Sequence, residues 1–300
     1  MDLIKHVSGA LFKSRRPRIF LVLFVLGTLL AVVSATAVVV SSKRQNNMGP
    51  TSTVFLPLYI YPVPGAWDPL DHVINQYPSL GFTVVINPDS GPGGGPTPDV
   101  NYTREITKLS IRRNVRLLGY VPTNYANRDI SDVYQDIQTY ANWPTAGLNP
   151  TLAVHGIFFD ETPQQYDDAS MTYLRDLTRA VKRKGGLGPD NFVVHNPGAV
   201  PDSRYLETAD STVILEDTYD TFLERQGADM LTNISHGNRS QVCAIVHSAP
   251  NFQNNNNQMR EFIKQLRGVA NEMFVTDLSE NYYSSFSGAW GDFVALMAAS

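Results

Sequence analysis

The chain contains very little cysteine, and this limits the chemistry open to its 300 residues. The single cysteine, Cys243, cannot form an internal disulfide. It stands in the apolar run 242–246, with no cationic residue beside it in the sequence. A thiol in such surroundings packs as a small hydrophobe and is a poor nucleophile. We therefore expect Cys243 to lie in the core.

An excess of positive charge is also missing. The formal net charge is −4, and only 17% of the residues are charged. Nucleic-acid binding needs a basic face for the phosphates. The composition therefore argues against nucleic acid as a partner, while the length is compatible with one large core or two ordinary ones.

Several catalytic motifs are absent as well. The sequence has no G-x-S-x-G element and no phosphate-binding loop. Its glycine-rich segment 91–96 is interrupted by prolines and lacks the G-x-G-x-x-G spacing of a dinucleotide site. The first predicted strand, 55–61, carries no histidine, and His195 and His247 alone make an incomplete ligand set. We therefore predict no cofactor and no metal.

One long hydrophobic run is present near the N-terminus. Residues 19–40 form a stretch of 22 residues without a charge, enough to cross about 30 Å of hydrocarbon as a helix. More basic residues precede it than follow it, which directs the N-terminus to the cytoplasm. We predict a type II membrane protein with a cytoplasmic segment at 1–18, a signal anchor at 19–40, a stalk at 41–53 and an outward-facing domain at 54–300. Cleavage as a signal peptide, giving a secreted form, is the alternative.

Three N-glycosylation sequons fit an exported domain. They begin at Asn101, Asn233 and Asn238. A single sequon can arise by chance. Together with the export signal, the three indicate passage through a secretory pathway.

After residue 53, short runs rich in β-branched and aromatic residues alternate with amphipathic or polar segments. The predicted strands are 55–61, 82–87, 115–121, 155–160, 191–195, 212–216, 241–247 and 273–277. The predicted helices lie near 68–77, 100–113, 131–140, 166–184, 202–208, 219–226, 256–269 and 287–298. Eight such pairs predict an α/β fold of the (β/α)₈ TIM-barrel type. An open doubly wound sheet is the main alternative.

Two of the predicted strands run directly into adjacent carboxylates. The fourth ends in Asp160 and Glu161, and the sixth in Glu216 and Asp217. The carboxyl ends of barrel strands meet at one face, so these acids should share a site. The strand spacing predicts a separation of about 5–9 Å, which spans the carboxylate pairs of both retaining and inverting glycosidases. The alternative is that the acids cap helices or pair with arginines.

Aromatic and amide side chains accompany the acids at the strand ends. Sugar rings stack on aromatic faces, while hydroxyl and amide groups bond the ring hydroxyls. For any one tyrosine, core packing is the alternative. The predicted substrate-binding residues are Tyr59, Tyr61, Tyr120, Asn124, Asn196, Asp217, Tyr219 and Asp277.

Three segments carry a resemblance to a known family. They are FLPLYIYPVPGAW at 55–67, HGIFFDE at 155–161 and VILEDTYD at 213–220. In these the chain resembles the spherulin-4 family, which is grouped with glycoside hydrolase family 135. The resemblance implies a (β/α)₈ barrel that cleaves α-1,4 linkages between N-acetylgalactosamine units of the fungal exopolysaccharide galactosaminogalactan. It also implies Asp160, Glu161 and Glu216 as the catalytic acids.

The implied substrate constrains the mechanism. In an α-linked galactosamine, the 2-acetamido group is cis to the leaving oxygen and cannot attack from the opposite face, so the enzyme must supply its own nucleophile or base. We expect a monomeric catalytic domain whose partners are the polysaccharide and, through the anchor, the membrane. A non-catalytic carbohydrate-binding or coat protein of the spherulin type, and a hydrolase of another bond such as a phosphodiester, are the alternatives.

Overall fold

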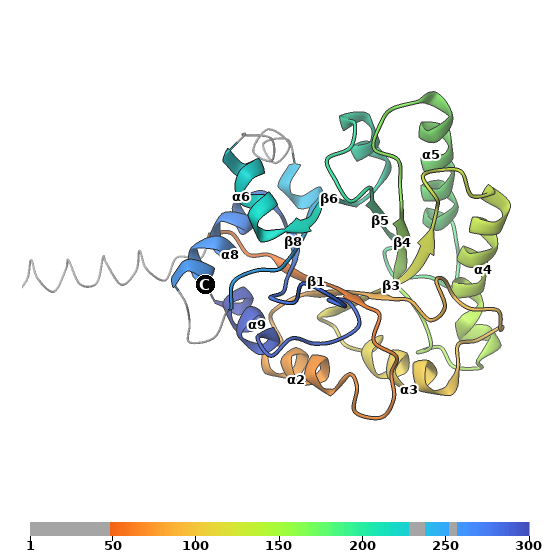
Figure 1. Ribbon diagram of the computed structural model, residues 1–300. Helices are drawn as coiled ribbons and strands as arrows, with labels where there is room; N and C mark the ends of the chain where they lie inside the picture. Colours follow the sequence, from red (N-terminus) through yellow and green to blue (C-terminus); the bar gives the residue numbers. More distant parts are fainter. Residues whose placement is uncertain (1–48, 228–237, 252–256, 300) are drawn as a thin grey trace, which may run out of the picture. The chain divides into compact units, whose positions relative to one another are not determined.

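The computed structural model describes residues 49–227, 238–251 and 257–299 (Figure 1). Eight parallel strands pair in chain order, and the last pairs with the first to close a barrel. The strands are β1 (Thr53–Leu58), β2 (Phe82–Ile86), β3 (Val115–Pro122), β4 (Gly156–Asp160), β5 (Phe192–Asn196), β6 (Ser211–Thr218), β7 (Val242–His247) and β8 (Glu272–Val275). The closed barrel confirms the predicted fold class and excludes an open sheet.

Helices surround the strands (Figure 1). The α-helices are α2 (Asp68–Gln76), α3 (Val100–Leu109), α4 (Ile130–Ala146), α5 (Asp168–Lys182), α6 (Tyr219–Gly227), α8 (Asn257–Val269) and α9 (Trp290–Ala298), with short 3₁₀ helices η1 (Ser203–Thr208) and η2 (Arg239–Gln241). Two predictions need correction. The segment predicted as a helix at 202–208 is a 3₁₀ turn, and the helix predicted at 131–140 continues to Ala146, with Pro144 in its last turn.

The strands form as predicted because both of their faces are covered, by the barrel interior and by the helices. All five residues of β2 are buried, and so are the first four of β4. Cys243 is fully buried in β7, as the sequence indicated. Burial also raises the pKa of its thiol, which keeps the thiol protonated.

Two glycines allow close approaches that position the carboxyl end of the barrel. A Cβ on Gly156 would lie 1.9 Å from the carbonyl oxygen of Phe192, so β4 and β5 can pair in this register only with glycine there. That register sets Asp160 opposite Asn196. A Cβ on Gly119 would lie 2.6 Å from the ring of Tyr140, whose hydroxyl donates to the carbonyl oxygen of Tyr120 at 2.9 Å.

Strand β6 contains an irregularity that its sequence did not reveal. Val213 pairs with Cys243 and Leu215 with Ala244, so Ile214 is an extra residue opposite β7. Because side chains alternate along a strand, one inserted residue reverses the face that each later side chain takes. The bulge therefore decides the direction in which Glu216, one residue beyond Leu215, points.

The predicted localisation needs correction. Within the described ranges, no helix is both long and apolar enough to cross a membrane. A span needs about 20 residues, whereas the longest described helix, α4, has 17. This finding contradicts the predicted type II membrane protein. The predicted segments 1–18 and 19–40, and most of the predicted stalk at 41–53, lie outside the described residues.

Candidate active site

Asp160 and Glu216 meet at the carboxyl end of the barrel, where Asn196 joins them. Asp160 ends β4, Glu216 lies near the end of β6, and Asn196 ends β5 between them. Asn196 Nδ2 donates to Asp160 Oδ1 at 2.8 Å and to Glu216 Oε2 at 2.7 Å. Because both oxygens accept from the same nitrogen, they lie no more than about 5.5 Å apart. The fold thus brings together acids that are 56 positions apart in the sequence.

Two tyrosines contact the other oxygens of the same carboxylates. The Tyr120 hydroxyl donates to Asp160 Oδ2 at 2.8 Å, and the Tyr283 hydroxyl donates to Glu216 Oε1 at 2.5 Å. Tyr59 lies between these tyrosines, with its ring centroid 5.7 Å from that of Tyr120 and 5.3 Å from that of Tyr283. Each acid therefore accepts from Asn196 on one oxygen and from a tyrosine on the other.

Burial raises the pKa of both carboxyl groups. For Asp160, hydrogen bonds from Tyr120 and Asn196 oppose this rise without cancelling it. For Glu216, Tyr283 and Asn196 also oppose it, while the charge of Asp160 adds to it. A raised pKa favours the protonated form of a carboxyl group, which is the form that a general acid requires.

The neighbouring tyrosines remain protonated. Burial, followed by the charge of Asp160, raises the pKa of Tyr59 and of Tyr120. Burial, followed by the charge of Glu216, raises the pKa of Tyr283. All three hydroxyl groups therefore keep the hydrogen that they can donate.

Asp160 and Glu216 are neither helix caps nor partners of arginines in the described part of the chain. The side chains of Asp99, Asp129 and Asp167 accept from backbone N–H groups at the starts of α3, α4 and α5. Among the ion pairs of the described part of the chain, none involves Asp160 or Glu216. Both of these acids lie within strands, where they accept hydrogen bonds from neutral groups.

Glu161 differs from its neighbour Asp160. It is exposed, and its φ of 54° puts it in the left-handed region that non-glycine residues rarely adopt. Its carbonyl oxygen accepts from the backbone N–H of Tyr125 at 2.6 Å and from the Thr123 hydroxyl at 2.8 Å. The loop after β3 thus holds the backbone of Glu161 in this left-handed conformation, directly after Asp160 in the sequence. The predicted Asn124 lies exposed in this same loop, also at positive φ.

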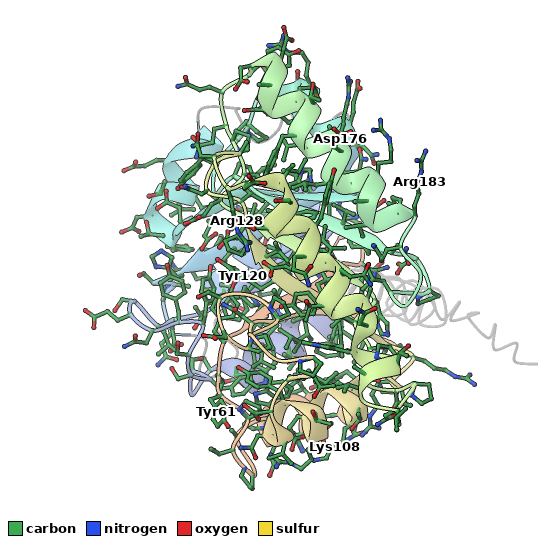
Figure 2. The ribbon with its side chains drawn as sticks, turned by 90° about the vertical axis from the view of Figure 1, so that its right-hand side faces the viewer. Tyr61, Lys108, Tyr120, Arg128, Asp176 and Arg183 are labelled. Carbon is green, nitrogen blue, oxygen red and sulfur yellow. The ribbon has the colours of Figure 1, made fainter. Side chains whose placement is uncertain are left out.

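The structure does not bring two predicted tyrosines to the acids. Tyr61 packs edge-on against Tyr102, and its hydroxyl accepts from Asn101 at 2.9 Å; Figure 2 shows it well apart from Tyr120. The ring of Tyr219 is buried against Phe262, 4.8 Å between centroids, so it packs in the layer between α6 and α8. The Tyr219 ring is buried, whereas Tyr61 is 48% exposed, and the predicted binding role of each remains a prediction.

The two remaining predicted acids are half-buried. Asp217 Oδ1 accepts from the backbone N–H of Thr218 at 2.7 Å. Asp277 follows β8, and its Oδ1 is buried without a hydrogen-bond partner among the described residues. Neither residue contributes a hydrogen bond to the Asp160–Asn196–Glu216 bridge.

Two residues of the site were not among the predicted ones. Tyr283 contacts Glu216 from the segment after β8, and His247, at the end of β7, helps to lower the pKa of Glu216. His247 stacks on Tyr282 with 4.4 Å between centroids and 6° between planes. The sequence signals were the tyrosine pair that follows the last strand and the histidine at a strand end. Neither signal indicates which partner such a side chain contacts.

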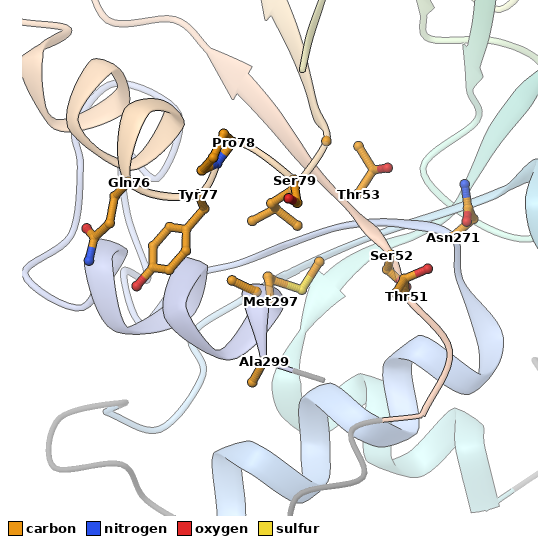
Figure 3. A pocket seen from close by; sticks show the side chains of 13 residues that line it. Thr51, Ser52, Thr53, Gln76, Tyr77, Pro78, Ser79, Asn271, Met297 and Ala299 are labelled. Carbon is orange, nitrogen blue, oxygen red and sulfur yellow. The ribbon is translucent and has the colours of Figure 1, made fainter. Parts of the chain in front are cut away.

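The opposite end of the barrel carries a different feature. A pocket of about 430 Å³ lies beside the starts of β1, β2 and β8, lined among others by Thr51, Tyr77, Asn271 and Met297 (Figure 3). Among the described residues that line it, none carries a side-chain carboxylate. In the described ranges, no group of three or more histidine, cysteine, aspartate or glutamate side chains could hold a metal ion.

The chain folds into a closed parallel barrel, and two carboxyl groups lie side by side at the carboxyl end of its strands. It therefore belongs to the class of barrel proteins in which such a pair can serve as acid and base. The spherulation-specific family 4 (Spherulin4) profile matches residues 53–297, and the chain belongs to this family. This confirms the resemblance seen in the sequence.

Two known proteins are similar to the chain. The crystal structure of Aspergillus clavatus Sph3 in complex with GalNAc is 59% identical, with a TM-score of 0.81, and the match covers 84% of this chain and 99% of that one. Spherulin-4 of Physarum polycephalum is 36% identical over 165 residues, 55% of this chain. The chain matches only 44% of the length of that curated relative.

Proposed function

We propose that this protein is an endo-acting glycoside hydrolase that cleaves α-1,4-linked N-acetylgalactosamine in a polysaccharide such as galactosaminogalactan. The observation that carries the proposal is the pair formed by Asp160 and Glu216, bridged by Asn196 at the barrel mouth. The similarity to Sph3, which was crystallised with GalNAc, supports the choice of sugar.

The spacing of the two acids supports a retaining mechanism. Their bridged oxygens lie within about 5.5 Å of each other, and retaining glycosidases hold their carboxylates about 5–5.5 Å apart. Inverting enzymes use a wider gap, because a water molecule must fit between the base and the sugar. The acetamido group of the α-linked substrate cannot act as nucleophile, so one of these carboxylates takes that role.

The donors around each acid support one assignment of roles. Asp160 accepts from Tyr120, from Asn196 and from the backbone N–H of Glu161, which favours the ionised nucleophile. Glu216 has the charge of Asp160 beside it, which favours its protonated form and the role of general acid. Asp160 attacks the anomeric carbon while Glu216 gives its proton to the leaving oxygen. Glu216 then takes a proton from water, whose oxygen attacks the anomeric carbon and releases Asp160.

The proposal is tested by incubating the full chain with purified galactosaminogalactan and sizing the products by mass spectrometry. We expect N-acetylhexosamine oligomers, and no such products with Asp160→Asn. The matched control is Glu207→Gln, which removes an exposed carboxylate of η1 and should leave hydrolysis unchanged. Binding of the polymer without any cleavage would reject the hydrolase and support the non-catalytic carbohydrate-binding alternative.

A further inference from the structure

The NH₂ group of Asn196 is fully engaged by the protein. The residue is only 6% exposed. Its Oδ1 accepts from the backbone N–H of Gly198 at 2.9 Å, and this contact fixes which end of the amide is the NH₂ group. Both hydrogens of that group then go to Asp160 and Glu216. No amide hydrogen is left to donate to a sugar hydroxyl, so Asn196 would not bind the substrate as a donor.

This geometry restricts where a proton can be on the two acids. An amide NH₂ only donates, and an unprotonated carboxyl oxygen accepts better than a protonated one, so the contacts favour unprotonated Asp160 Oδ1 and Glu216 Oε2. A proton carried by either acid is therefore favoured on the opposite oxygen. On Asp160 that oxygen faces Tyr120, and on Glu216 it faces Tyr283. A tyrosine hydroxyl can accept as well as donate, so it can hydrogen-bond to its carboxyl group whether that group is protonated or ionised.

We infer that Asn196 is a positioning residue that holds Asp160 and Glu216 at a fixed separation and directs the exchangeable proton of each to its tyrosine-facing oxygen. The inference rests on the proposed function, because it assigns Asn196 a part in acid–base catalysis. Asn196 acts through the two carboxylates and makes no contact of its own with the sugar.

The inference predicts a specific change in pH dependence. Hydrogen bonds from Asn196 stabilise the charged forms of both acids and lower both pKa values against the effect of burial. Removing them should raise both pKa values. The titratable groups that interact with the pair from neighbouring elements are Tyr59 after β1, Tyr120 of β3, Glu161 after β4, Cys243 and His247 of β7, and Tyr282 and Tyr283 after β8.

The experiment is a ¹³C NMR titration of the carboxyl groups in the full chain and in Asn196→Ala, with signals assigned through Asp160→Asn and Glu216→Gln. We expect both pKa values to be higher in Asn196→Ala. In hydrolysis, both limbs of the pH–rate profile should move to higher pH. The kcat should fall by roughly 10²-fold, as for a misplaced catalytic group, with KM little changed.

Controls separate positioning from a general loss of structure. Asn87→Ala removes an asparagine that follows β2 and accepts from the backbone N–H of Gly91. Asn87 is not among the described donors to Asp160 or Glu216, so this variant should shift neither pKa. Asn196→Asp keeps the size of the side chain but replaces a donor with an acceptor, and should raise both pKa values if Asn196→Ala does not fold. The shifts should persist in a His247→Gln background, which excludes titration of His247 as their source.

Unchanged carboxyl pKa values in the folded Asn196 variants would overturn the inference. So would a variant in which KM rises while kcat and the pH profile stay as in the parent, because that is the result expected of a substrate-binding residue. The titration needs no turnover. If the parent protein releases no oligomers, the proposed function fails while the positioning role can still be confirmed or rejected.

Discussion

Asp160 and Glu216 differ in the groups that reach them, and this difference should be visible in single variants. Asp160 has three donors, including the backbone N–H of Glu161. Glu216 has two donors and a neighbouring negative charge. Donors favour the ionised carboxylate and a like charge disfavours it, and the proposed division of roles between nucleophile and acid rests on this difference.

We predict that Asp160→Asn lowers kcat by roughly 10⁴-fold or more on every substrate, because no nucleophile remains. Glu216→Gln should slow hydrolysis of the natural polymer by about 10²–10⁴-fold, the usual contribution of a general acid. An aryl oligosaccharide with a good leaving group needs little protonation and should lose much less in kcat/KM, which reports the step in which the leaving group departs. Steady-state kinetics on both substrates tests the assignment, and the reverse pattern would exchange the two roles.

The raised carboxyl pKa values also predict a stability effect. A carboxyl group whose pKa is higher in the folded than in the unfolded state contributes most to stability below the unfolded value, near pH 4, and that contribution is lost as the pH rises through the folded value. At pH 7, which is above the unfolded value, the raised pKa values of Asp160 and Glu216 therefore make the fold less stable than it is near pH 4. Glu216→Gln should raise Tm at pH 7 by about 2–4 °C, the shift expected for roughly 1 kcal/mol in a domain of this size.

Thermal melts from pH 4 to pH 8 measure this effect. The advantage of Glu216→Gln over the parent should shrink as the pH falls towards 4. The exposed Glu207→Gln serves again as the control and should follow the parent throughout. A constant offset at all pH values would mean that repacking, and not the charge, causes the difference.

At the scale of elements, the register between β4 and β5 determines whether Asp160 can reach Asn196. It depends on Gly156, where a Cβ would meet the carbonyl oxygen of Phe192 at 1.9 Å. The strand ends are visible in the sequence as polar residues after apolar runs. Their alignment across strands is not, because it depends on contacts between segments that are far apart in the chain.

We predict that Gly156→Ala destabilises the protein by about 1–3 kcal/mol, the usual cost of overpacking a tight site, and lowers activity by more than the loss of folded protein explains. Urea denaturation and kcat corrected for the folded fraction measure the two effects. Gly268→Ala is the matched control. A Cβ there meets nothing within 4 Å, and the change should stabilise α8 slightly. Equal behaviour of the two variants would contradict the role given to the register.

The loop between β3 and α4 is a second element with a specific expectation. Asn124, Tyr125 and Ala126 all have positive φ, and the backbone N–H of Tyr125 bonds to the carbonyl oxygen of Glu161. Such unfavourable backbone is maintained chiefly at functional sites. Tyr125 is 54% exposed, so its ring is free to stack on a sugar beside the acids.

We predict that Tyr125→Ala lowers kcat/KM for the polymer by roughly 2–10-fold, corresponding to a contact of about 0.5–1.5 kcal/mol. Tyr134→Ala removes a tyrosine that is 37% exposed on α4 and should have no effect. Kinetics on oligomers of increasing length compare the two. A loss of the same size in both variants would mean that Tyr125 does not bind the sugar.

At the scale of the whole molecule, closure of the barrel is what assembles the site. β8 pairs with β1, and this brings Tyr283, which follows the last strand, next to Tyr59, which follows the first. The backbone N–H of Tyr59 donates to the carbonyl oxygen of Tyr283 at 2.9 Å. Tyr283 then reaches Glu216 of β6. No local sequence pattern can predict the contact between Tyr59 and Tyr283, since most of the barrel lies between them in the sequence.

The assembled geometry predicts the stereochemistry of the reaction. Because the bridged oxygens lie within about 5.5 Å, hydrolysis should proceed with retention and first release the α-anomer. Proton NMR of the anomeric signals, recorded before mutarotation, measures this. A β-anomer as the first product would require a wider working separation and would contradict the double displacement.

The eight strands, the (β/α)₈ class, the buried cysteine and the position of the acids at strand ends could all be predicted from the amino-acid sequence. These features follow from local hydrophobic periodicity and from the chemistry of neighbouring residues. Three other features became visible only in the folded barrel: Asn196 bridges Asp160 and Glu216, Ile214 forms a bulge before Glu216, and the rings of Tyr61 and Tyr219 pack against Tyr102 and Phe262. The reason is that strand register and side-chain direction are set by contacts between distant segments, which exist only when the barrel has closed.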